Sequence, residues 1–469
     1  MSMANVKILR SAINRLRGAI GSVYKDWRGE TDRAHMALLR ASRTWPRSAL
    51  KAYQWRQLKI LVAHAWYTVP FYRQRMAAAG VSPHDIRSEQ DFQRLPVLDR
   101  SSIYDNAERM VSDCYPRCRL ERRTSAGSTG EPVAVYLDPR RLRLSVTEEI
   151  WADGWSGWRP GEPVAMVWGD ESGAVGAGGF RRWVRGHIHS PGFIVDARSL
   201  SREGFLEFAD KYRKWRPGLV VAYASALRPL AEFLLEEAVH PAAPHAVISS
   251  AELLAESTRQ LAQRAFGAPV LDRYGCRETG LVAFQCGPAG HYHVNMLRIY
   301  LEVVSEDGRP VEPGQPGKVL LTDLGSFAMP LIRYQVGDMA AWAAYRRCPC
   351  GTGAECLERI EGRTSDFVRS PLGHRVHRAK FNALILGTPG IRQYRLVQES
   401  LREVRLEIVE SRPLAPDLLR GLCEQVRSVI GGEVEVRIGR VSRLPQTAAG
   451  KYRYVESRVP DGPAPAMEK

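Results

Sequence analysis

The chain contains 469 residues, of which 44% are apolar and 25% are charged, and these fractions are typical of a folded globular protein. At about 150 residues per domain, this length accommodates a large domain together with a small one. No apolar run reaches the ~18 residues that a membrane-spanning helix needs, and no secretory leader is recognisable. The eight cysteines do not have the spacing of a disulfide framework. The composition therefore favours a soluble, cytoplasmic protein, either a monomer or a homodimer.

The positive charge is distributed unevenly along the chain. Basic residues outnumber acidic ones by 67 to 51, and residues 1–60 alone hold 13 basic and three acidic side chains. Because the remainder is nearly balanced, we expect no nucleic-acid binding. Apolar residues recur at helical spacing between residues 6 and 23, with arginines among them. Residues 1–60 therefore read as a basic helical N-terminal extension, which either packs on its own protein or makes weak contact with an anionic membrane surface.

Short apolar segments alternate with helical segments from about residue 160. The segments that favour buried strands are 164–168, 219–221, 247–248 and 270–271. Between them lie stretches with helical spacing, such as the one that begins after Ser201 and contains Phe205, Phe208 and Tyr212. This alternation predicts the α/β class, with a mainly parallel sheet covered by helices, in a large N-terminal body over residues 61–363.

The pattern changes after Arg363. Residues 394–397 and 404–408 alternate like half-exposed strands, and an apolar helical stripe follows over 418–430. A last alternating segment covers residues 434–438. These elements predict a small C-terminal α+β lid domain with a β-β-α-β order over residues 367–459. The tail at 460–469, rich in Pro and Ala, is expected to be disordered.

The most informative motif is the loop Thr-Ser-Ala-Gly-Ser-Thr-Gly-Glu-Pro at residues 124–132. Its backbone N–H groups and hydroxyls can surround phosphate oxygens, although it lacks the Gly-Lys-Ser/Thr ending of a Walker loop. Four more motifs follow it: Tyr274-Gly275-Cys276-Arg277-Glu278-Thr279-Gly280, Met329–Tyr334 with Gly337-Asp338, Gly362-Arg363-Thr364-Ser365-Asp366, and Leu444–Lys451. Each motif alone is weak evidence, but the ordered set is specific.

In this order the five motifs resemble those of the adenylate-forming ligases, and in particular the phenylacetate–CoA ligase branch with its relatives in polysaccharide gene clusters. The resemblance extends from Phe71 to Lys451. It implies a body and a lid joined by a hinge at 364–366. It also implies that ATP and Mg²⁺ convert a small carboxylic acid into an acyl-adenylate, whose acyl group then passes to coenzyme A. An amine or a sugar hydroxyl remains an alternative acceptor, as in an amide- or ester-forming ligase.

A non-catalytic binding protein on the same fold is a further alternative, and the presence of Lys451 argues against it. By resemblance, Lys451 bridges the substrate carboxylate and the α-phosphate, Glu278 binds Mg²⁺, and Thr129 completes the catalytic set. The resemblance places adenine against Tyr274 and the ribose hydroxyls against Asp338. The remaining implied nucleotide-binding residues are Ser125, Gly127, Ser128, Gly130, Ala251, Glu252, Gly275 and Arg363.

Three positions depart from the usual pattern of these motifs. Glu131 stands where a lysine is frequent, Ala126 replaces a serine or glycine, and Arg277 replaces a small hydroxyl residue. Because Lys451, Glu278 and Asp338 are all retained, we interpret the changes as tuning and not as loss of activity.

A second group of residues has the chemistry of a metal site. Cys286, His293, Cys348 and Cys350 supply thiolate and imidazole ligands in a set of four, which suits a structural Zn²⁺. His291 is a substitute for His293. The alternative is a set of reduced, buried thiols, because Cys-x-Cys alone is a weak signal and about 50 residues separate the two halves of the set.

Overall fold

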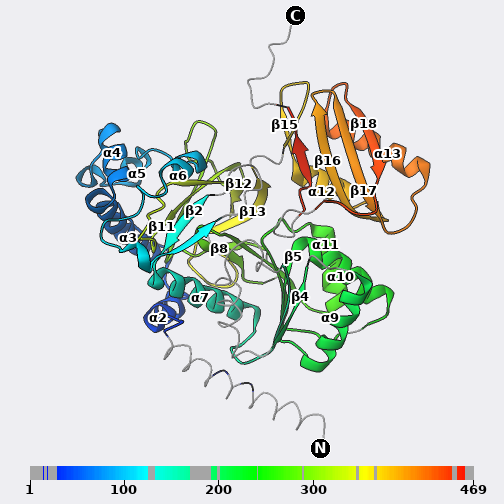
Figure 1. Ribbon diagram of the computed structural model, residues 1–469, viewed down its shortest axis with the longest axis horizontal. Helices are drawn as coiled ribbons and strands as arrows, with labels where there is room; N and C mark the ends of the chain where they lie inside the picture. The colour runs from blue at the N-terminus through cyan, green and yellow to red at the C-terminus, as the bar shows by residue number, and fades with distance from the viewer. Residues whose placement is uncertain are drawn as a thin grey trace, which may run out of the picture.

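The computed structural model describes residues 14, 18, 29–124, 133–169, 192–197, 201–239, 241–287, 290–344, 348–363, 367–445 and 452–459. Some predicted features lie outside these residues: Ser125, Gly127, Ser128, Thr129, Gly130, the hinge at 364–366, Lys451, the tail, and nearly all of the N-terminal amphipathic segment. The described residues form a large body and a smaller C-terminal domain, which Figure 1 shows side by side.

The body is built on one sheet of eleven strands. In pairing order they are β10 (Ile299–Val304), β11 (Pro316–Asp323), β12 (Tyr334–Trp342), β13 (Cys356–Arg363), β9 (Tyr292–Val294), β8 (Gly280–Gln285), β7 (Val270–Cys276), β6 (Ala246–Ser250), β5 (Leu219–Tyr223), β3 (Val164–Trp168) and β4 (Gly192–Asp196). A separate antiparallel hairpin joins β1 (Glu121–Thr124) to β2 (Ala134–Leu137). The predicted strands at 164–168, 219–221, 247–248 and 270–271 are all present.

Strands β4, β3, β5, β6 and β7 pair in parallel and form the predicted helix-covered half of the sheet. The helices α9 (Arg202–Trp215), α10 (Ala224–Glu236) and α11 (Glu256–Phe266) cover one face (Figure 1). Alternate residues of β3 serve the two faces: Ala165 packs in the core beneath these helices, whereas Met166 packs on the other side with Trp158. Burial on both faces explains why these strands are continuous apolar runs.

The other half of the sheet corrects the expectation of a mainly parallel sheet. All pairings from β7 through β8, β9, β13, β12 and β11 to β10 are antiparallel, so the sheet is mixed. The connections explain this difference. Only Arg277–Thr279 separates β7 from β8, and a connection this short can make a hairpin but not a parallel crossover.

The N-terminal helices belong to the body. They are α2 (Arg33–Ser42), α3 (Arg47–Thr68), α4 (Pro70–Ala78), α5 (Glu89–Gln93), α6 (Arg100–Asn106) and α7 (Pro139–Asp153), with 3₁₀ turns at Pro83–Asp85, Arg117–Arg119 and Gly154–Ser156. The expected boundary at residue 60 falls inside α3, and Leu39, Leu50 and Leu58 share one core with strands of the antiparallel half. Residues 33–60 are therefore not a separate extension. None of the described helices is both long and apolar enough to cross a membrane.

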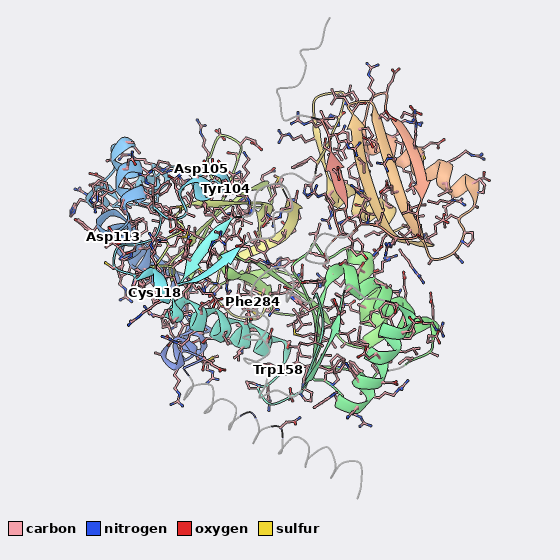
Figure 2. The ribbon with its side chains drawn as sticks, viewed as in Figure 1. Tyr104, Asp105, Asp113, Cys118, Trp158 and Phe284 are labelled. Atoms are coloured by element: carbon pink, nitrogen blue, oxygen red, sulfur yellow. The ribbon has the colours of Figure 1, made fainter. Side chains whose placement is uncertain are left out.

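Helix α7 and the 3₁₀ turn that follows it pack on the antiparallel half through aromatic side chains, Trp151 from the helix and Trp155 from the turn. Trp151 and Trp155 both contact Phe284 of β8, with ring centroids 5.0 and 5.5 Å apart. Phe284 is labelled near the middle of the body in Figure 2. These contacts connect α7, which follows the β1–β2 hairpin in the chain, to the strand that begins just after the Glu278 turn.

The C-terminal domain has its own core. It contains β14 (Phe367–Arg369), β15 (Arg375–His377), α12 (Arg378–Ile385), β16 (Ile391–Ser400), β17 (Glu403–Glu410), α13 (Pro416–Ile430), β18 (Glu435–Arg440) and β19 (Val455–Ser457). The predicted β-β-α-β order corresponds to β16, β17, α13 and β18. These strands form a four-stranded sheet in the order β18-β17-β16-β19, and β14 pairs with β15.

This domain contacts the body at α10 and at the start of α11. Arg392 of β16 lies 3.1 Å from Glu232 of α10, and Arg228 of α10 donates to the carbonyl of Leu386 at 3.2 Å. Ala255, which precedes α11, packs against the core of the C-terminal domain. Charged side chains therefore make much of the contact between the two parts.

Candidate active site

The carboxyl ends of the parallel strands bring several predicted residues to one edge of the sheet. Ala251 and Glu252 follow β6 directly, and the φ of +69° at Ala251 turns the chain sharply there. An Oε atom of Glu252 accepts a hydrogen bond from the Ser225 N–H at 2.8 Å, which ties this turn to the start of α10. Tyr223 ends β5, and its ring lies 4.1 Å from that of Trp168 at the end of β3. Crevices at such strand ends commonly hold ligands in α/β folds.

The turn between β7 and β8 requires glycine at two positions. A side chain at Gly275 would bring its Cβ to 2.5 Å from the carbonyl oxygen of Gly280, so the two strands can approach only without it. Gly280 has a φ of +69°, in the left-handed region that favours glycine. These two constraints explain why a glycine stands on each side of Glu278 in the predicted motif.

Tyr274, Asp338 and Arg363 form one hydrogen-bonded group. The Tyr274 hydroxyl donates to Asp338 Oδ2 at 2.8 Å, and Arg363 Nε lies 3.1 Å from Asp338 Oδ1. Asp338 and Arg363 are direct neighbours across β12 and β13. Burial and the charge of Asp338 raise the pKa of Tyr274 well above its usual value, and Asp338 raises the pKa of Arg363. A carboxylate offers four acceptor positions, so Asp338 can still accept ribose hydroxyls.

Glu278 is buried and is paired with a residue that the sequence analysis did not identify. Its Oε1 lies 3.2 Å from Arg100 Nη1 and accepts a hydrogen bond from the Tyr334 hydroxyl at 3.0 Å. A carboxylate held here suits Mg²⁺, which is commonly bound by one or two carboxylates together with substrate phosphates. Glu278 would hold that ion. Tyr334 lay inside a motif, but Arg100 is 178 residues away and no spacing linked it to Glu278.

The start of the predicted phosphate loop lies beside this turn. Arg277 Nη1 donates to the carbonyl of Thr124 at 3.2 Å, and Thr124 is the last residue of β1 before the loop. Thr124 is also paired with Ala134 across the hairpin, so the strand before the loop ends opposite the start of the strand after it. The arginine that departs from the usual motif therefore anchors the loop at its base. The loop residues themselves lie outside the described part of the chain.

The described residue Tyr454 lies three positions after Lys451 and packs in the core of the C-terminal domain. The Arg378 guanidinium stacks 4.2 Å from the centre of its ring. Burial of Tyr454, together with the charge of Glu252 in the body, raises the pKa of its hydroxyl.

The four predicted metal ligands are brought together. The ligand atoms of Cys286, His293, Cys348 and Cys350 all lie within 4.8 Å of one another. The Sγ atoms of Cys286 and Cys348 are 3.5 Å apart, and Cys350 Sγ lies 3.4 Å from His293 Nε2. A tetrahedral zinc with Zn–S bonds of about 2.3 Å requires sulfurs roughly 3.8 Å apart, so this donor set fits Zn²⁺. His293, and not His291, belongs to the set.

Neighbouring side chains orient His293. Its Nδ1 lies 3.2 Å from Cys356 Sγ, and its ring stacks on Trp155 with centroids 5.8 Å apart. Burial lowers the pKa of His293 to about 4, so the ring is neutral near pH 7, as a metal ligand must be. The sequence analysis missed Cys356, although three of the eight cysteines fall within residues 348–356.

Comparisons with known proteins agree with this architecture. Residues 368–458 match the family model of the CapK C-terminal domain. A phenylacetate-coenzyme A ligase of Thermus thermophilus is 26% identical over 446 residues, covering 88% of this chain and 97% of the relative. Protein CapK of Staphylococcus aureus is 19% identical and covers 78% of this chain and 80% of the relative.

A solved structure of 2-hydroxyisobutyryl-CoA ligase in its postadenylation state matches with a TM-score of 0.74 at 21% identity, covering 89% of this chain and 91% of that one. The same ligase in its thioesterification state gives a TM-score of 0.61. The chain therefore has the fold of the adenylate-forming ligases, and its sequence is similar to phenylacetate-coenzyme A ligases and CapK. The predicted resemblance is confirmed, as is the α/β class with a large body and a small C-terminal α+β domain, whereas the sheet is mixed and not mainly parallel.

Proposed function

We propose that this protein is an AMP-forming ligase that activates a small carboxylic acid with ATP and transfers the acyl group to coenzyme A. One observation carries the proposal. Tyr274, Asp338 and Arg363 form a group suited to binding a ribose. It lies near the carboxyl ends of the strands, together with Glu278, a buried carboxylate suited to binding a metal. Both lie beside the base of the predicted phosphate loop. The similarity to phenylacetate-coenzyme A ligases over almost the whole chain supports the same reaction.

The chemistry requires two anions to approach each other. An oxygen of the acid attacks the α-phosphorus of ATP, the bond from that phosphorus to the bridging oxygen breaks, and pyrophosphate leaves with the electron pair. Asp338 holds the ribose, Tyr274 flanks the adenine, and Lys451 neutralises the carboxylate and the α-phosphate as they meet. Mg²⁺, when bound at Glu278, supplies further neutralisation of phosphate charge.

The acceptor divides this proposal into two versions. Coenzyme A is favoured by the relatives named phenylacetate-coenzyme A ligase. An amine or a sugar hydroxyl is the second candidate, because residues 368–458 match the CapK C-terminal family and the lid presents the acceptor in our proposed cycle. The two versions share the adenylation step and differ only in the second nucleophile.

Pyrophosphate exchange across a panel of acids tests the adenylation step directly. Acids that support exchange are then offered with coenzyme A, amines and sugars, and the product identifies the acceptor. Replacing Lys451 with Ala should reduce exchange by about 10²–10³-fold, the scale for losing one transition-state charge donor. Lys469→Ala in the C-terminal tail is the matched control. Exchange at a normal rate in Lys451→Ala, or none with any acid in the wild type, contradicts the proposal.

We further propose that the lid adopts two positions during the cycle, with the hinge at 364–366. The two TM-scores to one ligase in two states, 0.74 and 0.61, support a domain arrangement near the first of them. A proline at Ser365 fixes φ and should hold one arrangement, so one half-reaction should survive and the other fail. Wild-type rates for both half-reactions would place the hinge elsewhere.

Zn²⁺ bound by Cys286, His293, Cys348 and Cys350 is the remaining part of the proposal. Protein purified without chelator should contain about one zinc per chain, and Cys348→Ser with Cys350→Ser should remove it and lower the thermal midpoint. Cys423→Ser, which changes a thiol in the C-terminal domain, is the control. A metal-free protein with unchanged thermal stability would support reduced thiols instead.

A further inference from the structure

The Arg100–Glu278 ion pair joins a part-exposed guanidinium to a buried carboxylate. Arg100 is the first residue of α6, and its Nη1 lies 3.2 Å from Glu278 Oε1 and donates to the Tyr334 hydroxyl at 3.3 Å. The Glu278 side chain is only 4% exposed, whereas that of Arg100 is 26% exposed. A carboxylate this deeply buried is strongly disfavoured without a compensating charge. Arg100 supplies that charge from the more open side.

Binding of a metal–nucleotide changes the charge balance at this point. If Glu278 holds Mg²⁺, one carboxylate faces a divalent cation as well as the guanidinium, and the positive charges repel each other. The polyphosphate that accompanies the metal provides the missing negative charge. A guanidinium is well suited to it, because its planar set of donors matches phosphate oxygens in a bidentate manner.

The surroundings place Arg100 at the polyphosphate end of the site. The Tyr274–Asp338–Arg363 group marks the nucleoside end. Arg100 pairs with Glu278 and donates to the Tyr334 hydroxyl. The residue before Glu278 holds the base of the phosphate-type loop. A guanidinium beside Glu278 and next to this loop is therefore suited to contact polyphosphate oxygens.

We propose that Arg100 has two alternating partners: Glu278 in the nucleotide-free protein, and the β- and γ-phosphates of ATP once the metal–nucleotide is bound. This inference rests on the proposed function. When the bond between the α-phosphorus and the bridging oxygen breaks, the electron pair stays on pyrophosphate. Arg100 stabilises this developing charge, and after pyrophosphate leaves it returns to Glu278.

Binding measurements on the full chain separate the two partners. In Arg100→Gln, the affinity for inorganic pyrophosphate with Mg²⁺, measured by calorimetry, should fall by about tenfold or more, the scale of one lost charge-assisted hydrogen bond. The affinity for AMP, which lacks the β- and γ-phosphates, should be unchanged. Arg100→Lys keeps the charge without the planar donors and should be intermediate. Arg75→Gln is the matched control, because Arg75 donates to Ser102 of α6.

Thermal stability tests the resting partner. With EDTA present, Arg100→Gln should melt below wild type, and adding Glu278→Gln to it should recover most of that loss, because no buried charge is then left unpaired. Equal losses of pyrophosphate and AMP affinity, or unchanged pyrophosphate affinity, would overturn the inference. If the wild type itself binds neither ATP nor pyrophosphate, the proposed function fails instead.

Discussion

Two groups of arginine–carboxylate pairs meet at the turn between β7 and β8, and they differ in exposure. The closed group consists of Arg141, Arg298, Glu148 and Asp323, whose side chains are at most 1% exposed. The open group consists of Arg100 with Glu278 and Arg363 with Asp338, in which the arginines are 26% and 37% exposed. Both groups have charge-compensated carboxylates, but only the open group borders solvent, as our proposed exchange of partners requires.

The closed group connects the backbone under the turn. Arg141 of α7 pairs with Asp323 at 2.8 Å and donates to the carbonyl of Thr279. Arg298 pairs with Glu148 and donates to the carbonyl of Leu281 at 2.7 Å. Burial disfavours the charged form of Arg298, but its carboxylate partners outweigh this and raise its pKa.

The difference in exposure shows how arginine–carboxylate pairs can either stabilise the fold or bind a ligand. A fully enclosed guanidinium donates its hydrogen bonds to protein groups. Removing one carboxylate partner therefore leaves a buried, unpaired charge. A part-exposed guanidinium can release its carboxylate when a phosphate or ribose arrives. Buried pairs should therefore control stability, and the part-exposed pairs should control ligand affinity.

The largest effect is expected in the closed group. Asp323→Asn leaves Arg141 and Arg298 without their shared carboxylate and should lower the free energy of unfolding of the body by about 3–5 kcal/mol. The measurement is the urea midpoint of the body, with the C-terminal domain as an internal reference. Asp307→Asn, which breaks the exposed pair with Arg309, is the control and should leave the midpoint unchanged. An Asp323→Asn midpoint equal to that of wild type would remove the distinction between the groups.

A smaller effect, on binding and not on folding, is expected in the open group. Asp338→Ala should weaken ATP by about tenfold to a hundredfold, because a carboxylate that accepts ribose hydroxyls contributes roughly 1.5–3 kcal/mol. Titration calorimetry with ATP measures it, and Asp417→Ala on the surface of the lid is the control. Unchanged ATP affinity with a lower rate would show that Asp338 does not hold the ribose.

A related substitution changes the metal requirement. Glu278→Gln removes the charge that attracts Mg²⁺, so the Mg²⁺ concentration for half-maximal exchange should rise while AMP affinity is retained. Exchange rates measured over a range of Mg²⁺ concentrations test this expectation. An unchanged Mg²⁺ dependence would assign the ion to other residues.

The smallest effect is expected between lid and body. The Arg392 side chain is 39% exposed and that of its partner Glu232 is 15% exposed. Arg392→Ala should therefore weaken the contact between lid and body by less than about 1 kcal/mol. The ratio of the two half-reaction rates should then change by roughly fivefold at most. Adenylation and acyl-transfer rates measured separately give this balance. Arg420→Ala is the control, because Arg420 pairs within its own helix. A tenfold or larger change would mean that this pair governs the lid position.

Much of the architecture could be predicted from local patterns. The strand at 164–168 coincides with β3, and the β-β-α-β order of the lid was correct, because alternation and helical spacing record which faces are buried. The antiparallel half was not predicted, because pairing direction depends on the connections. The prediction of a separate extension over residues 1–60 was wrong for residues 33–60. The basic residues of this segment gave no sign that the apolar face of α3 packs in the body.

The amino-acid sequence already specifies the chemistry available to this protein: a Glu278 turn with a glycine on each side, Asp338 and Arg363 in motifs, and four ligands suited to zinc. Which charges meet depends on how elements far apart in the chain pack together. Arg100 reaches Glu278 from 178 residues away, and Cys356 reaches His293 from 63 residues away. Sequence spacing describes neighbours along one strand or helix, whereas these pairs form where separate elements pack. Burial then makes each unpaired charge too costly to leave uncompensated.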